Sequence, residues 1–83
     1  MKELRVTFTP AATAELRGLA GERRKQFDLG MAAIARDPRG CGSSAVRGDP
    51  DRRDATVAKV AFITYLVSEA VVTVTVVKVV PLP

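Results

Sequence analysis

The sequence contains no histidine and no tryptophan, and its single cysteine is Cys41. One cysteine excludes an internal disulfide and a multi-cysteine metal site. The lack of histidine excludes a histidine-based catalytic triad and a histidine-ligated metal. It also leaves the Cys41 thiol without a histidine to activate it, so we interpret Cys41 as an incidental loop residue. We therefore expect no metal site and no cofactor.

Long apolar runs are missing as well. A transmembrane helix needs roughly 18–20 apolar residues, and the run from Leu66 to Val77 is interrupted by Glu69 and by threonines. The N-terminal stretch from Met1 to Arg5 lacks the apolar segment of a cleavable signal peptide. From these absences we expect a soluble protein of the reducing cytoplasm with no membrane partner.

The length and charge of the chain limit its organisation and its partners. With 83 residues the sequence has room for one hydrophobic core, so we expect a single domain over residues 1–83. The net charge is +4 and the pI is about 9.8. This charge is compatible with a polyanionic or acidic protein partner, and equally with a soluble surface that is merely basic.

The richest β-strand signal lies between Ala55 and Val80, where ten of the twelve valines occur. β-Branched and aromatic residues favour strands, so we predict a hairpin of two strands, 55–67 and 71–80, joined by the polar turn 68–70. In the second strand valines alternate with Thr73 and Thr75, which is typical of a sheet with one buried face. The alternation breaks after Val76 and predicts a bulge or burial on both faces there.

The remaining elements precede this hairpin. We predict a strand over 4–9, a helix capped by Thr9 and Pro10, a second helix over 22–36, a weak strand over 44–47 and a polar turn over 48–54. Gly30 on the second helix permits the close approach of a neighbour. The element order is β-α-α-β-β-β. We expect an α+β fold in which a helical hairpin packs on one face of a four-stranded, twisted, mainly antiparallel sheet. The opposite face would remain open as a shallow concave surface.

Five basic residues are the candidate binding set. They are Arg47, Arg52, Arg53, Lys59 and Lys78. We expect Arg47, Lys59 and Lys78 on the three later strands, with the two neighbouring arginines on the turn between two of them. Converging on the open face, they would bind phosphates or an acidic partner.

The alternative is that these cations prevent exposed sheet edges from pairing with other chains and are neutralised by nearby acids. Those acids are Asp49, Asp51 and Asp54. The only tyrosine, Tyr65, is interpreted as core or rim filler that could also donate a hydrogen bond. No set of residues forms a catalytic signature, so no catalytic residue is assigned.

In their order along the chain, these elements resemble the RelE/ParE toxins of bacterial toxin–antitoxin pairs. The resemblance is carried by the first strand and helix start over 6–12, the helix end Arg36-Asp37-Pro38, and the segment Val46-Arg47-Gly48. It continues through the segment from Arg53 to Tyr65 and the valine-rich last strand, and so covers nearly the whole chain.

The resemblance implies that the first strand lies beside the last and that the open face is functional. In this family the RelE-like branch cleaves messenger RNA on the ribosome, whereas the ParE-like branch binds and inhibits DNA gyrase. Both are silenced by an antitoxin protein that wraps around the toxin. A cognate antitoxin is therefore the expected partner, with gyrase or the ribosome and its messenger RNA as possible targets.

The match to the family is incomplete where the chemistry would lie. Arg47 matches the basic residue before glycine, and Arg53 lies near the arginine that opens the third strand. The arginine usual in the middle of that strand falls on Ala61, and the basic, aromatic segment that typically follows the last strand is replaced by Pro81-Leu82-Pro83. Metal-independent RNA cleavage needs a proton donor and acceptor as well as cations.

No such donor and acceptor are evident, so binding of a macromolecule without catalysis is the leading interpretation. A ribosome-dependent messenger ribonuclease using Arg47, Arg53 and Lys59, and an orphan member of the fold that is not toxic, are the alternatives.

Overall fold

The elements of the chain follow the α+β order expected from its sequence. The structure, a computed structural model, describes residues 4–40 and 42–83, so Cys41 lies outside the described residues. Its elements are β1 (Arg5–Phe8), α1 (Pro10–Glu15), the 3-10 turn η1 (Leu16–Gly18), α2 (Gly21–Arg36), β2 (Ser44–Val46), β3 (Asp49–Val57), β4 (Ala61–Ser68) and β5 (Thr73–Pro81). The expected fold class is confirmed.

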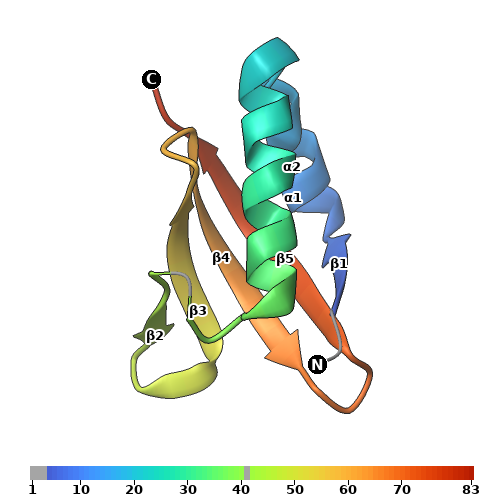
Figure 1. Ribbon diagram of the computed structural model, residues 1–83, viewed down its shortest axis with the longest axis vertical. Coiled ribbons are helices and arrows are strands. Elements are labelled where there is room, and N and C mark those ends of the chain that lie inside the picture. The colour runs from blue at the N-terminus through green and yellow to red at the C-terminus, as the bar shows by residue number, and fades with distance from the viewer. Residues whose placement is uncertain (1–3, 41) are drawn as a thin grey trace.

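The strands form one sheet in the order β1-β5-β4-β3-β2. β1 is parallel to β5, whereas the other three pairs are antiparallel. The sheet is therefore mixed and mainly antiparallel, with the first strand beside the last, as the resemblance implied. Figure 1 shows the long hairpin of β4 and β5 at its centre.

The sheet has five strands, which corrects the expected four. The apolar run 55–67 is not one strand, because a turn over 58–60 divides it between β3 and β4. Ala58 and Lys59 both adopt left-handed backbone conformations there, and the Val60 amide donates to the Val57 carbonyl at 2.9 Å. The polar segment 49–54 belongs to β3 and is not a turn, because its backbone pairs with β4.

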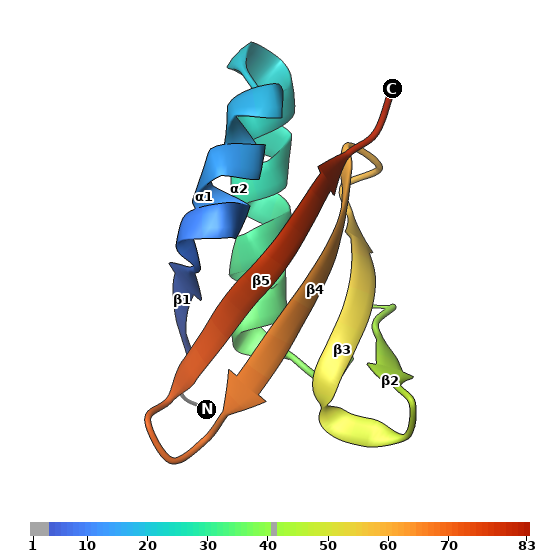
Figure 2. The same cartoon turned by 180° about the vertical axis from the view of Figure 1, so that it is seen from behind.

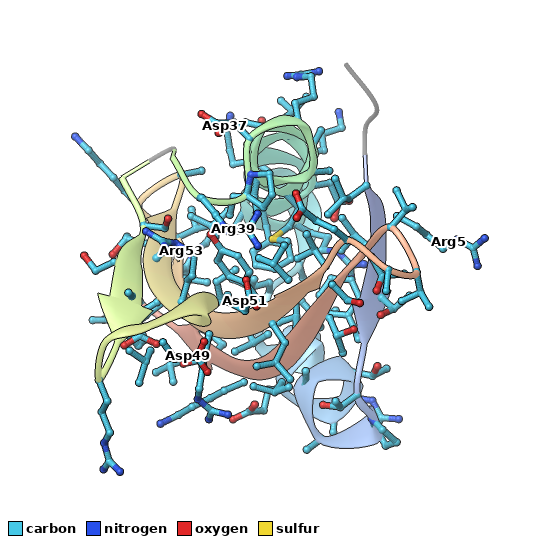
Figure 3. All side chains as sticks on the ribbon, turned by 90° about the horizontal axis from the view of Figure 1, so that it is seen from below. Arg5, Asp37, Arg39, Asp49, Asp51 and Arg53 are labelled. Carbon is cyan, nitrogen blue, oxygen red and sulfur yellow. The ribbon has the colours of Figure 1, made fainter. Side chains whose placement is uncertain are left out.

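The two helices run antiparallel and pack against the same side of the sheet (Figures 1 and 2). The Thr9 hydroxyl accepts a hydrogen bond from the Ala12 amide at 3.2 Å, which confirms the predicted N-cap. The chain reverses at Gly21, whose φ of 58° is the left-handed conformation expected there. The strands curve around α2 (Figure 3), so the uncovered side is the convex one and not the concave one expected.

One hydrophobic core lies between the helices and the sheet. Its fully buried side chains include Phe27 from α2, Ile63 and Tyr65 from β4, and Val74 from β5. The side chains of Phe8 and Phe27 contact each other with ring centroids 6.2 Å apart, which ties β1 to α2. The core thus joins all of the long elements.

Gly30 marks a close approach of α2 to β3. A Cβ atom at this position would overlap Cγ1 of Val57, a residue that is itself buried. The expectation that Gly30 permits a close neighbour is therefore confirmed, because Val57 occupies the space that a side chain would fill.

We expect Gly30→Ala to lower the free energy of unfolding by about 1–2 kcal/mol. Overpacking costs about 1–3 kcal/mol, while replacing glycine in a helix returns up to about 1 kcal/mol. Urea unfolding measures the change. Leu29→Ala is the control, because Leu29 lies on the same helix and is 68% exposed, so its loss should change stability little. A Gly30→Ala variant that is more stable than the wild type would contradict this packing.

Candidate functional site

The sheet face turned away from α2, here called the outer face, is left open by the helices (Figure 3). Strand register places Arg52 on β3 opposite Leu66 on β4, and Leu66 opposite Thr75 on β5. The Thr75 hydroxyl accepts a hydrogen bond from Thr7 of β1 at 3.1 Å. A row of side chains therefore crosses four strands, from an arginine through an apolar residue to two threonines.

A second row on the outer face contains a lysine and a carboxylate. Asp54 pairs with Thr64, and Thr64 pairs with Lys78. The Thr64 hydroxyl is buried and donates to Oδ1 of Asp54 at 2.7 Å. Beyond this row, Phe62 and Val80 pair with each other, and Val80 is 38% exposed. The outer face thus combines cations with partly exposed apolar side chains.

A β-bulge directs Lys78 onto this face. Val74 and Val76 point into the core, so strict alternation would bury Lys78 as well. The register between β4 and β5 shifts instead: Tyr65 pairs with Val76, and Thr64 pairs with Lys78. Val79 then takes the buried position, while Lys78 is exposed. The predicted irregularity after Val76 is confirmed, and it places the charge in solvent.

The start of α1 and its last residue hold the backbone of this bulge. β1 pairs with β5 as far as Val76, and beyond that point the edge of β5 faces α1. The Glu15 carboxylate accepts a hydrogen bond from the Val79 amide at 2.9 Å, and the Thr9 hydroxyl donates to the Val77 carbonyl at 3.5 Å. These side chains satisfy edge groups that a strand would otherwise pair. The sequence offered no signal for the role of Glu15, because its partner is 64 residues away.

Arg52 and Lys78 are exposed and form no ion pair with any described residue. The acids expected to neutralise them have other hydrogen-bond partners: Asp51 binds Arg39, and Asp54 accepts from Thr64. The outer face therefore carries two cations, Arg52 and Lys78, together with the Asp54 carboxylate, which keeps its negative charge while it accepts from Thr64.

The other three candidate residues lie elsewhere. Arg47 occupies the turn between β2 and β3 and lies beside Arg52 across a surface hollow. Arg53 points to the helix side, where its Nε donates to the Ser43 hydroxyl at 2.7 Å. Lys59 lies in the turn between β3 and β4, at the opposite end of β3 from Arg47, and not on a strand as expected. The five cations do not share one face: Arg52 and Lys78 do, and Arg47 adjoins them.

A cluster of charges joins three segments on the helix side, near the C-terminal end of α2 (Figure 3). The Arg39 guanidinium contacts both Asp51 on β3 and, at 3.4 Å, Glu69 after β4. Its hydrogen bond to Asp51, reinforced by Glu69, raises the pKa of Arg39 above its ordinary value. The Tyr65 hydroxyl donates to the Pro38 carbonyl. These contacts tie the loop after α2 to the sheet, and residue spacing could not have revealed them.

Tyr65 is fully buried, so its hydroxyl is unavailable to a ligand on the outer face. Within residues 4–40 and 42–83, no group of three or more acidic, cysteine or histidine side chains could hold a metal ion. No helix in this part of the chain is both long and apolar enough to cross a membrane. The chemistry that the outer face offers is charge and apolar contact.

The fold matches solved structures of bacterial toxins. The isolated Escherichia coli RelE toxin superposes with a TM-score of 0.78 at 23% identity, over 96% of this chain and 85% of that one. The intact E. coli RelBE complex superposes with a TM-score of 0.77 at 23% identity, over 96% of this chain and 98% of that one. The Mycobacterium tuberculosis RelBE2 complex superposes with a TM-score of 0.76 at 19% identity, over 98% of this chain and 100% of that one. No protein-family model and no curated protein sequence matches the chain. At these identities the similarity shows a shared RelE fold.

We expect Glu15→Ala to expose the Val79 amide to exchange with solvent and to lower the free energy of unfolding by about 1.5–3 kcal/mol, because a hydrogen bond to a charged acceptor is lost. Hydrogen exchange at Val79, followed by NMR, measures the effect. Glu22→Ala, which removes a carboxylate from the first turn of α2, should leave this amide protected. Unchanged protection at Val79 in Glu15→Ala would show that Glu15 does not hold the bulge.

Proposed function

We propose that this chain is a single-domain, RelE/ParE-like toxin of a toxin–antitoxin pair that acts in the cytoplasm by binding a macromolecule through its outer face. The shared fold supports this proposal, since it extends over 96% of the chain in the isolated RelE toxin. A fold alone does not define an activity. The proposal therefore depends on the residues of the outer face.

The observation that carries the proposal is a pair of cations, Arg52 and Lys78, on an open sheet face with apolar neighbours, neither of which forms an ion pair with any described residue. Leu66 is 37% exposed and lies directly opposite Arg52. An interface that combines partly exposed apolar side chains with positive charge suits a partner with acidic groups beside apolar ones. The charge would steer the encounter, and the apolar contacts would slow dissociation.

Binding is favoured over RNA cleavage by the surroundings of the polar groups. General acid–base chemistry needs a proton donor and a proton acceptor within reach of the substrate. Tyr65 is buried and bonded to Pro38, and the chain has no histidine. Asp54 lies on the outer face, where one of its oxygens accepts a hydrogen bond from the Thr64 hydroxyl.

The alternative, a ribosome-dependent messenger ribonuclease, requires several cations around one phosphate. Two of the cations assigned to the ribonuclease lie far from each other: Arg53 points to the helix side, and Lys59 lies in the turn between β3 and β4. That separation argues against a shared phosphate site, so the ribonuclease remains the second candidate.

A cognate antitoxin is the proposed partner. Solved relatives of this fold include the intact RelBE complex and an arginine-to-alanine variant of E. coli RelE bound to a RelB peptide. DNA gyrase, or the ribosome with its messenger RNA, is the proposed class of target.

We expect expression of this chain to arrest the growth of a bacterial host, and Arg52→Gln with Lys78→Gln to relieve the arrest. If each contact contributes about 1 kcal/mol, the two substitutions weaken target binding by more than about tenfold. Colony counts after induction measure the relief. A DNA-damage reporter and amino-acid incorporation distinguish gyrase inhibition from translation arrest.

The matched control is Arg24→Gln with Lys25→Gln, which removes the same charge from α2. Arg24 forms a surface ion pair with Asp28 at 3.1 Å and lies on a different surface from the outer face. Equal relief by both double variants would mean that net charge, and not the outer face, matters. Normal growth of cells expressing the wild-type chain, with neither reporter responding, would support the orphan interpretation instead.

A further inference from the structure

The side chains of the outer face are arranged in matching positions on the two sides of β4. This strand is the middle one of the five, and its outward side chains include Phe62, Thr64 and Leu66. Each of these three residues pairs with one residue of β3 and with one residue of β5. Every outward side chain on β3 in these rows therefore has a counterpart at the same height on β5.

The middle row carries opposite charges on the two sides of β4. Thr64 pairs with Asp54 on β3 and with Lys78 on β5. These two charged residues are two strand spacings apart, which is about 10 Å. Neither forms an ion pair with any residue that the structure describes. Asp54 accepts the Thr64 hydroxyl through Oδ1, and its second oxygen can accept a further hydrogen bond. Both charges are thus available to a partner outside the chain.

The rows above and below this one also have complementary ends. Phe62 lies between Thr56 and Val80, and both of these flanking residues are exposed and carry methyl groups for apolar contact. In the other row the ends are Arg52 and Thr75, a guanidinium donor and a hydroxyl that can accept from it. The β3 half of the outer face therefore complements its β5 half in all three rows.

We propose that the outer face binds the outer face of a second copy of this chain, with a two-fold axis along β4. In such an interface residue i of one copy contacts residue j of the other, and residue j contacts residue i. With the axis along β4, Asp54 of each copy faces Lys78 of the other copy, so two ion pairs form together. Phe62 and Leu66 lie along the axis and contact the same residues of the other copy, which removes apolar surface from water.

The shape of the outer face limits the strength of this dimer. Because the face is convex, two copies would contact each other along β4 and separate toward the edges of the sheet (Figure 3). The flanking cations, Arg52 and Lys78, have long side chains that can cross the widening gap. A contact of three short rows is smaller than a standard protein interface, so a weak and reversible dimer is expected.

Self-association goes beyond the proposed function, because it needs no target. Its regulatory consequence does rest on that function. The dimer would cover Arg52 and Lys78, the two cations through which the outer face is proposed to bind its target. Only the monomer could then bind the target, and the dimer would be a reservoir that is inactive at high concentration.

The test is sedimentation equilibrium of the full chain from about 10 μM to about 1 mM, the range in which weak complexes form, at about 0.15 M salt. We expect the average mass to rise from that of one chain toward that of two. Asp54→Asn and Lys78→Gln should each weaken association by about tenfold, because each removes both symmetry-related ion pairs. The two variants change the net charge in opposite directions, so a loss in both cannot result from net charge.

A charge swap tests the pairing itself. Asp54→Lys and Lys78→Asp each place like charges opposite each other across the axis, so each alone should abolish association. The double variant has the net charge of the wild type and restores opposite charges, so it should associate again. Asp28→Asn is the matched control, since it removes a carboxylate from α2 and should leave association unchanged. Urea unfolding of every variant distinguishes lost association from lost folding, and Asp54→Asn keeps an oxygen that can accept from Thr64.

A chain that stays monomeric over the whole range overturns the inference and leaves the outer face to a partner of another kind. A dimer that is unchanged in both Asp54→Asn and Lys78→Gln, or weakened equally in Asp28→Asn, also overturns it, because the contact then lies elsewhere. A folded swap variant that does not associate counts against the pairing in the same way. A monomeric chain that arrests growth overturns this inference alone, whereas a dimeric chain that never arrests growth overturns the proposed function alone.

Discussion

The burial of β5 between β1 and β4, with its valines against the helices, is the contact on which the structure depends. Val74, Val76 and Val79 are fully buried, and β5 is hydrogen-bonded to the first strand on one side and to β4 on the other. Burying a valine side chain contributes about 1.5 kcal/mol or more. β5 therefore joins chain segments that are about seventy residues apart, such as Thr7 and Thr75. Without it, neither β1 nor α1 would have a sheet to pack on.

The same strand links the core to the outer face. A strand buried on one face can carry a charge only on the other, and the bulge beside Val77 reconciles the inward valines with the outward Lys78. Beyond the part of β5 that pairs with β1, the Glu15 carboxylate accepts a hydrogen bond from the Val79 amide, and the Thr9 hydroxyl donates one to the Val77 carbonyl. The position of Lys78 is thus a consequence of core packing together with edge capping by α1, so the scaffold and the surface cannot vary independently.

Periodic features were predictable from sequence, and features defined by distant partners were not. The valine–threonine alternation, the Thr9 cap and the irregularity after Val76 all depend on neighbouring residues. The turn at Ala58 and Lys59 was missed because it contains no glycine, asparagine or proline. The polar part of β3, residues 49–54, was predicted as a turn because its side chains give no apolar alternation, although its backbone pairs with β4. The partners of Arg39 and Arg53 could not be read from spacing, since both depend on how the loop after α2 crosses the sheet.

The arrangement of polar groups also bears on what this fold does here. Tyr65 is buried beneath the loop after α2, in line with its interpretation as core filler. Arg53 was a candidate for the open face, yet it binds Ser43 in that loop. They stabilise the scaffold on the helix side, whereas the outer face carries Arg52, Lys78, Asp54, threonines and partly exposed apolar side chains. A surface of this kind can attract and hold a partner, but it supplies charge without an evident proton relay. The structural roles of Tyr65 and Arg53 are therefore the physical reason that our proposal places binding ahead of cleavage.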